Sequence, residues 1–91
     1  MEEKFLAAWE NNRQQAQKLG VRLRPMELTM LSAHRQLSGR RESDGFAALA
    51  DKGLLKLSLE ALAVSKAFTG LFTDEQANNA LRRLLDAGYN F

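Results

Sequence analysis

Apolar residues recur at helical spacing along most of this chain, and glycines repeatedly close the pattern. Over residues 2–19, Phe5 and Trp9 fall on one side of a helix together with Ala8, Ala16 and Leu19. Four helical patterns end in glycine followed by a bulky apolar residue: Gly20-Val21, Gly53-Leu54, Gly70-Leu71 and Gly88-Tyr89. Glycine adopts the left-handed conformation that ends many helices, and the next apolar residue packs back onto the last turn. The pattern therefore predicts a chain cut into short helices.

Residues 25–38 predict a second helix, with Pro25 at its first position, where the missing N–H costs nothing. This helix has two apolar faces, one with Met26, Met30, Ala33 and Leu37 and the other with Leu28 and Leu31. Gly39 ends it without an apolar residue after it, and residues 39–45 predict the most exposed internal connector. Ser43 or Asp44 is expected to cap a short third helix that buries Phe46 and Leu49.

Two further helices follow a buried connector at residues 54–57. Ser58 is a good N-cap for a mostly apolar helix over residues 59–69, and Thr73 forms a capping box with Gln76 for the last helix. The apolar arc of the last helix contains Ala77, Ala80, Leu81, Leu84, Leu85 and Ala87, and its polar side contains Asn78, Asn79, Arg82, Arg83 and Asp86. We expect the apolar arc to face the core.

Composition supports one all-α domain over residues 1–91, an orthogonal or irregular bundle of about five short helices. Leucine occurs 16 times and alanine 13 times, whereas there are two valines, no isoleucine and no cysteine. Leucine and alanine favour helices, and without disulfides the stability must come from apolar packing. The expected core is Phe5, Trp9, Phe46, Leu49, Leu59, Leu62, Phe68, Leu81, Leu84 and Leu85.

The positive charge is concentrated between Arg13 and Arg41, where seven basic residues accompany the single acid Glu27. Candidates for binding nucleic acid or another anion are Arg22, Arg24, Arg35, Arg40 and Arg41. The predicted helix over residues 25–38 would span roughly 21 Å and separate the two arginine pairs at its ends, so they need not form one patch. A merely solvated charged surface is the alternative interpretation.

Groups for catalysis are scarce, so we do not expect an enzyme, a cofactor, a metal site or a small-molecule substrate. His34 is the only histidine, and Ser32 lies two residues before it, a spacing that points the two side chains to different sides of a helix. Glu2 and Glu3 stand where a secretory signal would have basic residues, and no apolar run approaches the ~18 residues of a membrane span. These features predict a cytoplasmic protein without a membrane partner.

The surplus of apolar residues predicts a non-catalytic protein-binding module: a small adaptor, inhibitor or regulatory partner, including the case of a homodimer. The candidate interface residues are Met26, Leu28, Met30, Leu31, Leu54, Leu55, Leu71 and Phe72. The alternative function is nucleic-acid binding through the basic stretch 13–41.

Overall fold

Five α-helices and two short 3₁₀ helices make up the regular structure of residues 1–90, which are the residues that the computed structural model describes. In chain order they are α1 (Glu2–Lys18), α2 (Met30–Ser38), α3 (Phe46–Asp51), η1 (Leu55–Leu57), α4 (Leu59–Ala63), η2 (Lys66–Phe68) and α5 (Asp74–Asp86). No strand occurs in this part of the chain, and the predicted all-α class is confirmed. None of these helices is long and apolar enough to cross a membrane.

The predicted glycine ends are present after three of the helices. Gly20, Gly53 and Gly88 have φ values of 94°, 69° and 83°, in the left-handed region. The backbone N–H of the apolar residue after each glycine reaches back to the last helical turn: Val21 to the Ala16 carbonyl, Leu54 to that of Leu49 and Tyr89 to that of Leu84. This is the hydrogen bond of a Schellman motif, which satisfies carbonyls that a helix end leaves unpaired.

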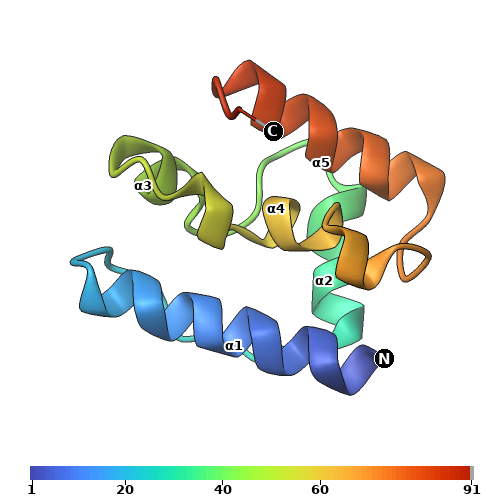
Figure 1. Ribbon diagram of the computed structural model, residues 1–91, viewed down its shortest axis with the longest axis horizontal. Coiled ribbons are helices and arrows are strands. Elements are labelled where there is room, and N and C mark those ends of the chain that lie inside the picture. The colour runs from blue at the N-terminus through green and yellow to red at the C-terminus, as the bar shows by residue number, and fades with distance from the viewer. Residues whose placement is uncertain (91) are drawn as a thin grey trace.

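The short helix α4 lies at the centre of the molecule, with α1 below it and α5 above it, and α2 runs across behind them (Figure 1). Two groups of buried side chains fill the space between these helices, and α1 contributes to both. The first group contains Phe5, Trp9, Ala33, Leu37, Leu59, Ala63, Phe68 and Ala80. The second contains Ala16, Val21, Phe46, Leu49, Leu55, Leu57 and Leu84.

Helix α2 is shorter than predicted, because it begins at Met30 and not at Pro25. The Thr29 side chain accepts a hydrogen bond from the Ser32 backbone N–H at 3.1 Å, so Thr29 is the N-cap. Residues 21–29 contain no helix and lead from the end of α1 to α2. Threonine is a preferred N-cap, whereas the proline only permits a helix to start.

The predicted helix over residues 59–69 is also wrong in length, since α4 ends at Ala63 and η2 follows a break at Ser65. The Ser65 hydroxyl donates to the Leu62 carbonyl at 2.8 Å, and serine bonds of this kind compete with the helical ladder. The predicted N-cap Ser58 is confirmed, and it accepts from the Ala61 N–H. Neither Ser43 nor Asp44 caps α3, whose N-cap is Gly45.

Most of the expected core is buried, and the exceptions lie on helix flanks. Leu62 and Leu81 are half-buried, while Leu85 is 61% exposed and Leu19, expected on the inner side of α1, is 57% exposed. Phe5 lies at the centre of the first group, with the Phe68 ring packed edge-on at a centroid distance of 5.1 Å. The prediction that Leu85 belongs to the core is wrong, because α5 packs with a different face toward the core.

Candidate functional site

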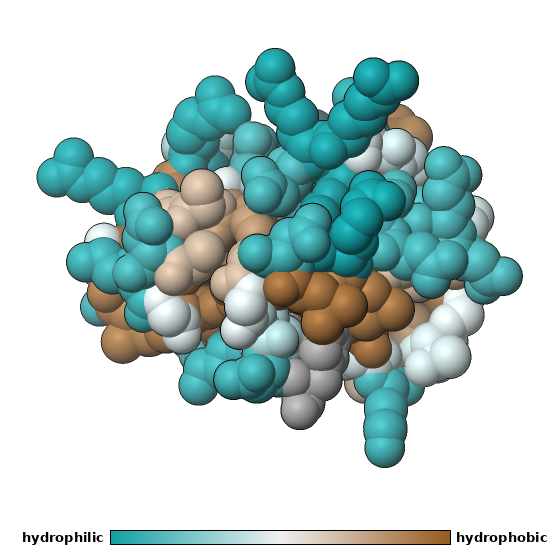
Figure 2. Space-filling view, turned by 90° about the horizontal axis from the view of Figure 1, so that it is seen from above, coloured by the Kyte–Doolittle hydropathy of each residue, from teal (hydrophilic) through white to brown (hydrophobic). Residues whose placement is uncertain are grey.

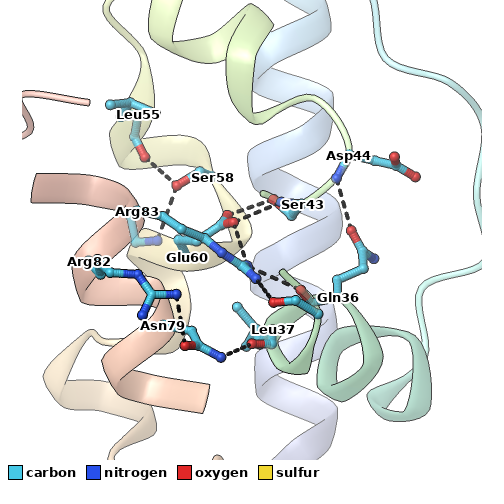
Figure 3. A network of polar contacts seen from close by, with 12 residues as sticks. Gln36, Leu37, Ser43, Asp44, Leu55, Ser58, Glu60, Asn79, Arg82 and Arg83 are labelled. Atoms are coloured by element: carbon cyan, nitrogen blue, oxygen red, sulfur yellow. Dashed lines mark hydrogen bonds and ion pairs between the residues drawn. The ribbon is translucent and has the colours of Figure 1, made fainter. Parts of the chain in front are cut away.

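An ion pair lies inside the protein, between α4 and α5. Glu60 is 0% exposed and Arg83 is 5% exposed, and Arg83 Nη1 lies 3.1 Å from Glu60 Oε2. Figure 3 shows the two side chains meeting between the helices, with Ser43 on the other side of the carboxylate. Arg83 was expected on the polar outer face, so this prediction is wrong. A charge is buried in this way only when a partner and further hydrogen bonds compensate for the lost water.

The two charged groups bind the backbone on either side of Arg40 and Arg41. Arg83 Nη2 donates to the Gly39 carbonyl at 2.6 Å. Glu60 accepts from the Ser43 backbone N–H at 2.8 Å and from the Ser43 hydroxyl at 2.6 Å. We call residues 39–45 the anchored loop, because one end is held by the arginine and the other by the glutamate. Gly39 to Glu42 are exposed as predicted, but Ser43 is buried.

A polar row on α5, formed by Gln76, Asn79 and Arg83, completes the C-terminal end of α2. Gln76 Nε2 donates to the His34 carbonyl, Asn79 Nδ2 to that of Leu37, and Arg83 Nη1 to that of Gln36. The last carbonyls of a helix need partners from outside it. Gly39 has a φ of −75° and does not form a left-handed cap, so side chains of another helix take that role. The positive Arg83 also suits the negative end of the α2 dipole.

The polar row determines how α5 is rotated about its own axis. The buried side chains are Gln76, Ala80, Arg83 and Leu84, whereas the apolar arc of the sequence also includes Ala77, Leu81 and Leu85. At 100° per residue, the centre of the buried face is turned roughly 60° away from the centre of the apolar arc. The helix therefore buries an arginine and leaves one apolar edge outside the core.

We call this edge, formed by Ala77, Leu81 and Leu85, the α5 flank. Ala77 and Leu81 are half-buried and Leu85 is exposed. Ala77 and Leu81 line an open groove of about 340 Å³, whose other lining residues include Ala63, Val64, Phe68 and Phe72, and Leu85 lies four residues beyond Leu81 on the same helix, outside this lining. Figure 2 looks down onto the α5 side of the molecule and shows hydrophobic surface between hydrophilic side chains there. Among the described residues, Asp74 is the only charged side chain that lines the groove.

Arg24 connects the segment after α1 to the anchored loop. Arg24 Nη2 lies 3.1 Å from Asp44 Oδ1, so the segment after α1 touches the anchored loop. Arg13 Nη2 donates to the Arg24 carbonyl at 2.6 Å. Partial burial lowers the pKa of Arg13 below the ordinary guanidinium value, and the nearby Asp44 carboxylate opposes that shift. Residues 25–29 are not part of α2, and the salt bridge joins the segment that carries Arg22 and Arg24 to the loop that carries Arg40 and Arg41.

The candidate interface residues of the sequence differ in their exposure, and one of them is buried. Leu55 is 7% exposed and belongs to the core. Leu31 is 68% exposed on α2, and Met26, Leu28, Met30, Leu54, Leu71 and Phe72 are half-buried. Of these residues, only Phe72 lines the groove beside α5. The α5 flank itself was missed, because its leucines were assigned to the core.

The only histidine of the chain contacts α5 and the residue before its N-cap. His34 Nδ1 lies 2.8 Å from Gln76 Oε1, and its ring packs on Phe72 at a centroid distance of 4.9 Å. Gln76 Oε1 also accepts from the Thr73 backbone N–H, so His34 belongs to the cap of α5. Within residues 1–90, no three side chains of histidine, cysteine, aspartate or glutamate come together as metal ligands.

Comparison of the chain with protein-family models, curated proteins and solved structures gives no match. The function must therefore be argued from the geometry of the groove, the α5 flank and the arginines.

Proposed function

We propose that this protein is a non-catalytic protein-binding module that docks a partner helix along the α5 flank. The observation that carries the proposal is the rotation of α5: Leu85 is 61% exposed while Arg83, two residues earlier, is 5% exposed. Burial of a leucine contributes about 1.5–3 kcal/mol. The observed orientation of α5 therefore lacks the stabilisation that an orientation with Leu85 buried would provide. An apolar edge beside an apolar groove is the usual form of a contact surface.

The dimensions and charge of the groove favour an amphipathic helix as the occupant. Ala77, Leu81 and Leu85 are four residues apart, and the row they form extends over about 12 Å at 1.5 Å per residue. A helix lays apolar residues at positions i, i+4 and i+7 into a groove of this kind. Asp74 at the N-terminal end of the row favours a lysine or arginine at the facing end of the partner. The proposed occupant is therefore a basic amphipathic helix.

A direct test uses a helix-forming peptide with leucines at positions i, i+4 and i+7 and lysines elsewhere. Titration of the labelled protein, followed by NMR, should shift the backbone amide signals of Ala77, Leu81 and Leu85. Leu85→Lys should weaken binding about tenfold or more, because it removes an apolar contact of the size of a buried leucine. Leu31→Lys is the matched control, since it adds the same charge at a similarly exposed leucine on α2 that is not part of the α5 flank.

Equal weakening by both variants, or signal shifts centred away from α5, would contradict the proposal. Sedimentation over a range of protein concentrations tests the alternative that the groove binds a second copy of the chain. If the protein self-associates and Leu85→Lys abolishes the self-association, the occupant is a second copy of the chain, and the proposal of a separate partner helix is wrong.

A further inference from the structure

Four exposed arginines from two distant parts of the chain lie near one salt bridge. Arg24 and Asp44 form the bridge, and their side chains are 83% and 48% exposed. Arg41 is three residues before Asp44, and Arg40 is four residues before it. An extended chain spans at most ~3.6 Å per residue, so the Cα atoms of Arg41 and Arg40 lie within about 11 Å and 14 Å of the Asp44 Cα atom. Arg22 is two residues before Arg24. We call Arg22, Arg24, Arg40 and Arg41 the basic face.

Both halves of the basic face are held in place by the fold. Burial alternates along residues 21–24, with Val21 and Leu23 turned inward, so Arg22 and Arg24 share the outer side. The Leu23 side chain packs against Gly45, where a Cβ atom would overlap it. Arg40 and Arg41 lie between the two fixed ends of the anchored loop. Little ordering of the backbone therefore remains to be done when a ligand binds.

We propose that the basic face binds the phosphate backbone of double-stranded nucleic acid. All four cations are arginines, whose planar guanidinium groups donate paired hydrogen bonds to phosphate. Single-stranded nucleic acid is bound through exposed aromatic rings. Among residues 1–90, Phe5, Trp9, Phe46 and Phe68 are buried, and Phe72 and Tyr89 are half-buried. The chemistry thus fits duplex phosphates, contacted without sequence preference.

Asp44 and Glu42 set the strength of this binding. Both carboxylates are exposed on or beside the basic face, and Asp44 occupies the guanidinium of Arg24. A phosphate must compete with Asp44 for that arginine. The duplex complex is therefore expected in the range of non-specific binders, with a dissociation constant of about 10⁻⁴–10⁻⁶ M at physiological salt.

Fluorescence anisotropy with a labelled 20-base-pair DNA duplex, measured over a series of salt concentrations, tests the proposal. Each neutralised phosphate contributes about −0.9 to the slope of log K against log salt concentration. The double variant Arg40→Ala/Arg41→Ala should make the slope shallower by about two, and Arg22→Ala/Arg24→Ala should do the same. Asp44→Asn should tighten binding, because it removes the carboxylate that competes with phosphate for Arg24.

The control variant Arg82→Ala/Lys66→Ala removes two exposed cations from α5 and η2, outside the basic face. This control variant should leave the salt-dependence slope unchanged. If it makes the slope as shallow as the basic-face variants do, the proposal is wrong, because the net positive charge of the protein would then explain the binding. Tighter binding to a single strand of the same length would also overturn it. Vesicles of phosphatidylcholine with phosphatidylserine identify the competing ligand: vesicle binding that needs the same arginines, without duplex binding, assigns the face to a membrane surface instead.

Discussion

Replacing Glu60 with glutamine removes the charge that faces Arg83 while it keeps the size and shape of the side chain. The two oxygens of Glu60 accept from the Ser43 N–H, the Ser43 hydroxyl and Arg83 Nη1. The amide of glutamine has one oxygen and one NH₂ group, so only one of the two positions still accepts, and the NH₂ group either faces the Ser43 hydroxyl, which must then accept, or faces the two N–H donors. Arg83 would remain buried as an uncompensated charge, with its Nε already lacking a hydrogen-bond partner.

Breaking a buried ion pair from one side costs about 3–5 kcal/mol. A chain of 91 residues has a free energy of unfolding of roughly 5–14 kcal/mol, at about 0.05–0.15 kcal/mol per residue. Glu60→Gln is therefore expected to remove a large share of the stability. Arg83→Met should have a similar effect, because it strands the carboxylate and leaves the Gln36 and Gly39 carbonyls without this donor.

Urea unfolding, followed by circular dichroism and by the fluorescence of the buried Trp9, measures these free energies. The double variant Glu60→Gln/Arg83→Met should be more stable than the sum of the two losses predicts, by about 1–3 kcal/mol. Arg82→Met is the matched control on the exposed side of α5 and should change stability by no more than about 0.5 kcal/mol. Losses below about 1 kcal/mol for both single variants, with an additive double variant, would refute the reasoning.

Three further substitutions test the packing of α5 and of the loop, each by the midpoint of urea or thermal unfolding. Gly45→Ala should destabilise the protein by about 1–3 kcal/mol, because φ at Gly45 is +86° and the added Cβ overlaps the Leu23 side chain; an unchanged midpoint would mean that this contact is not formed. Thr73→Ala should cost about 0.5–2 kcal/mol through loss of the capping box, and a neutral effect would show that the cap does not hold the start of α5. Leu84→Ala should cost about 2–5 kcal/mol, whereas Leu85→Lys should change stability by less than about 0.5 kcal/mol; comparable losses at the two positions would show that α5 is rotated differently in solution.

Local signals in the sequence were sufficient for the helix ends that depend on neighbouring residues. The Schellman glycines and the Thr73–Gln76 capping box are formed within one or two turns, so their residues lie together in the sequence as well as in space. The rotation of α5 depends instead on Glu60, which lies 23 residues before Arg83. The apolar pattern of α5 predicts Arg83 on the solvent-exposed side of the helix, because the sequence of one helix holds no information about a carboxylate on another.

The dependence on contacts between distant residues also explains why the arginines and the α5 flank were only partly predicted. Exposure of Arg40 and Arg41 followed from the polar residues around them, and it is observed. The contact between Arg24 and the anchored loop was missed, because Thr29 rather than Pro25 caps α2 and residues 25–29 do not extend the helix. The α5 flank was missed for the opposite reason: its leucines match the core pattern, and only the buried arginine displaces them.

Hydrogen bonds from the polar row to the end of α2 also have a consequence for the order of events during synthesis. The Gly39 carbonyl receives its donor from Arg83, 44 residues further along the chain. While a ribosome is still making α5, the end of α2 and the loop after it lack these bonds, and the groove lacks one wall. A nascent or truncated chain without α5 therefore has neither the complete groove nor a loop held at both ends. If the groove and the arginines bind as proposed, an incomplete chain without α5 would not compete with the folded protein for the same ligands.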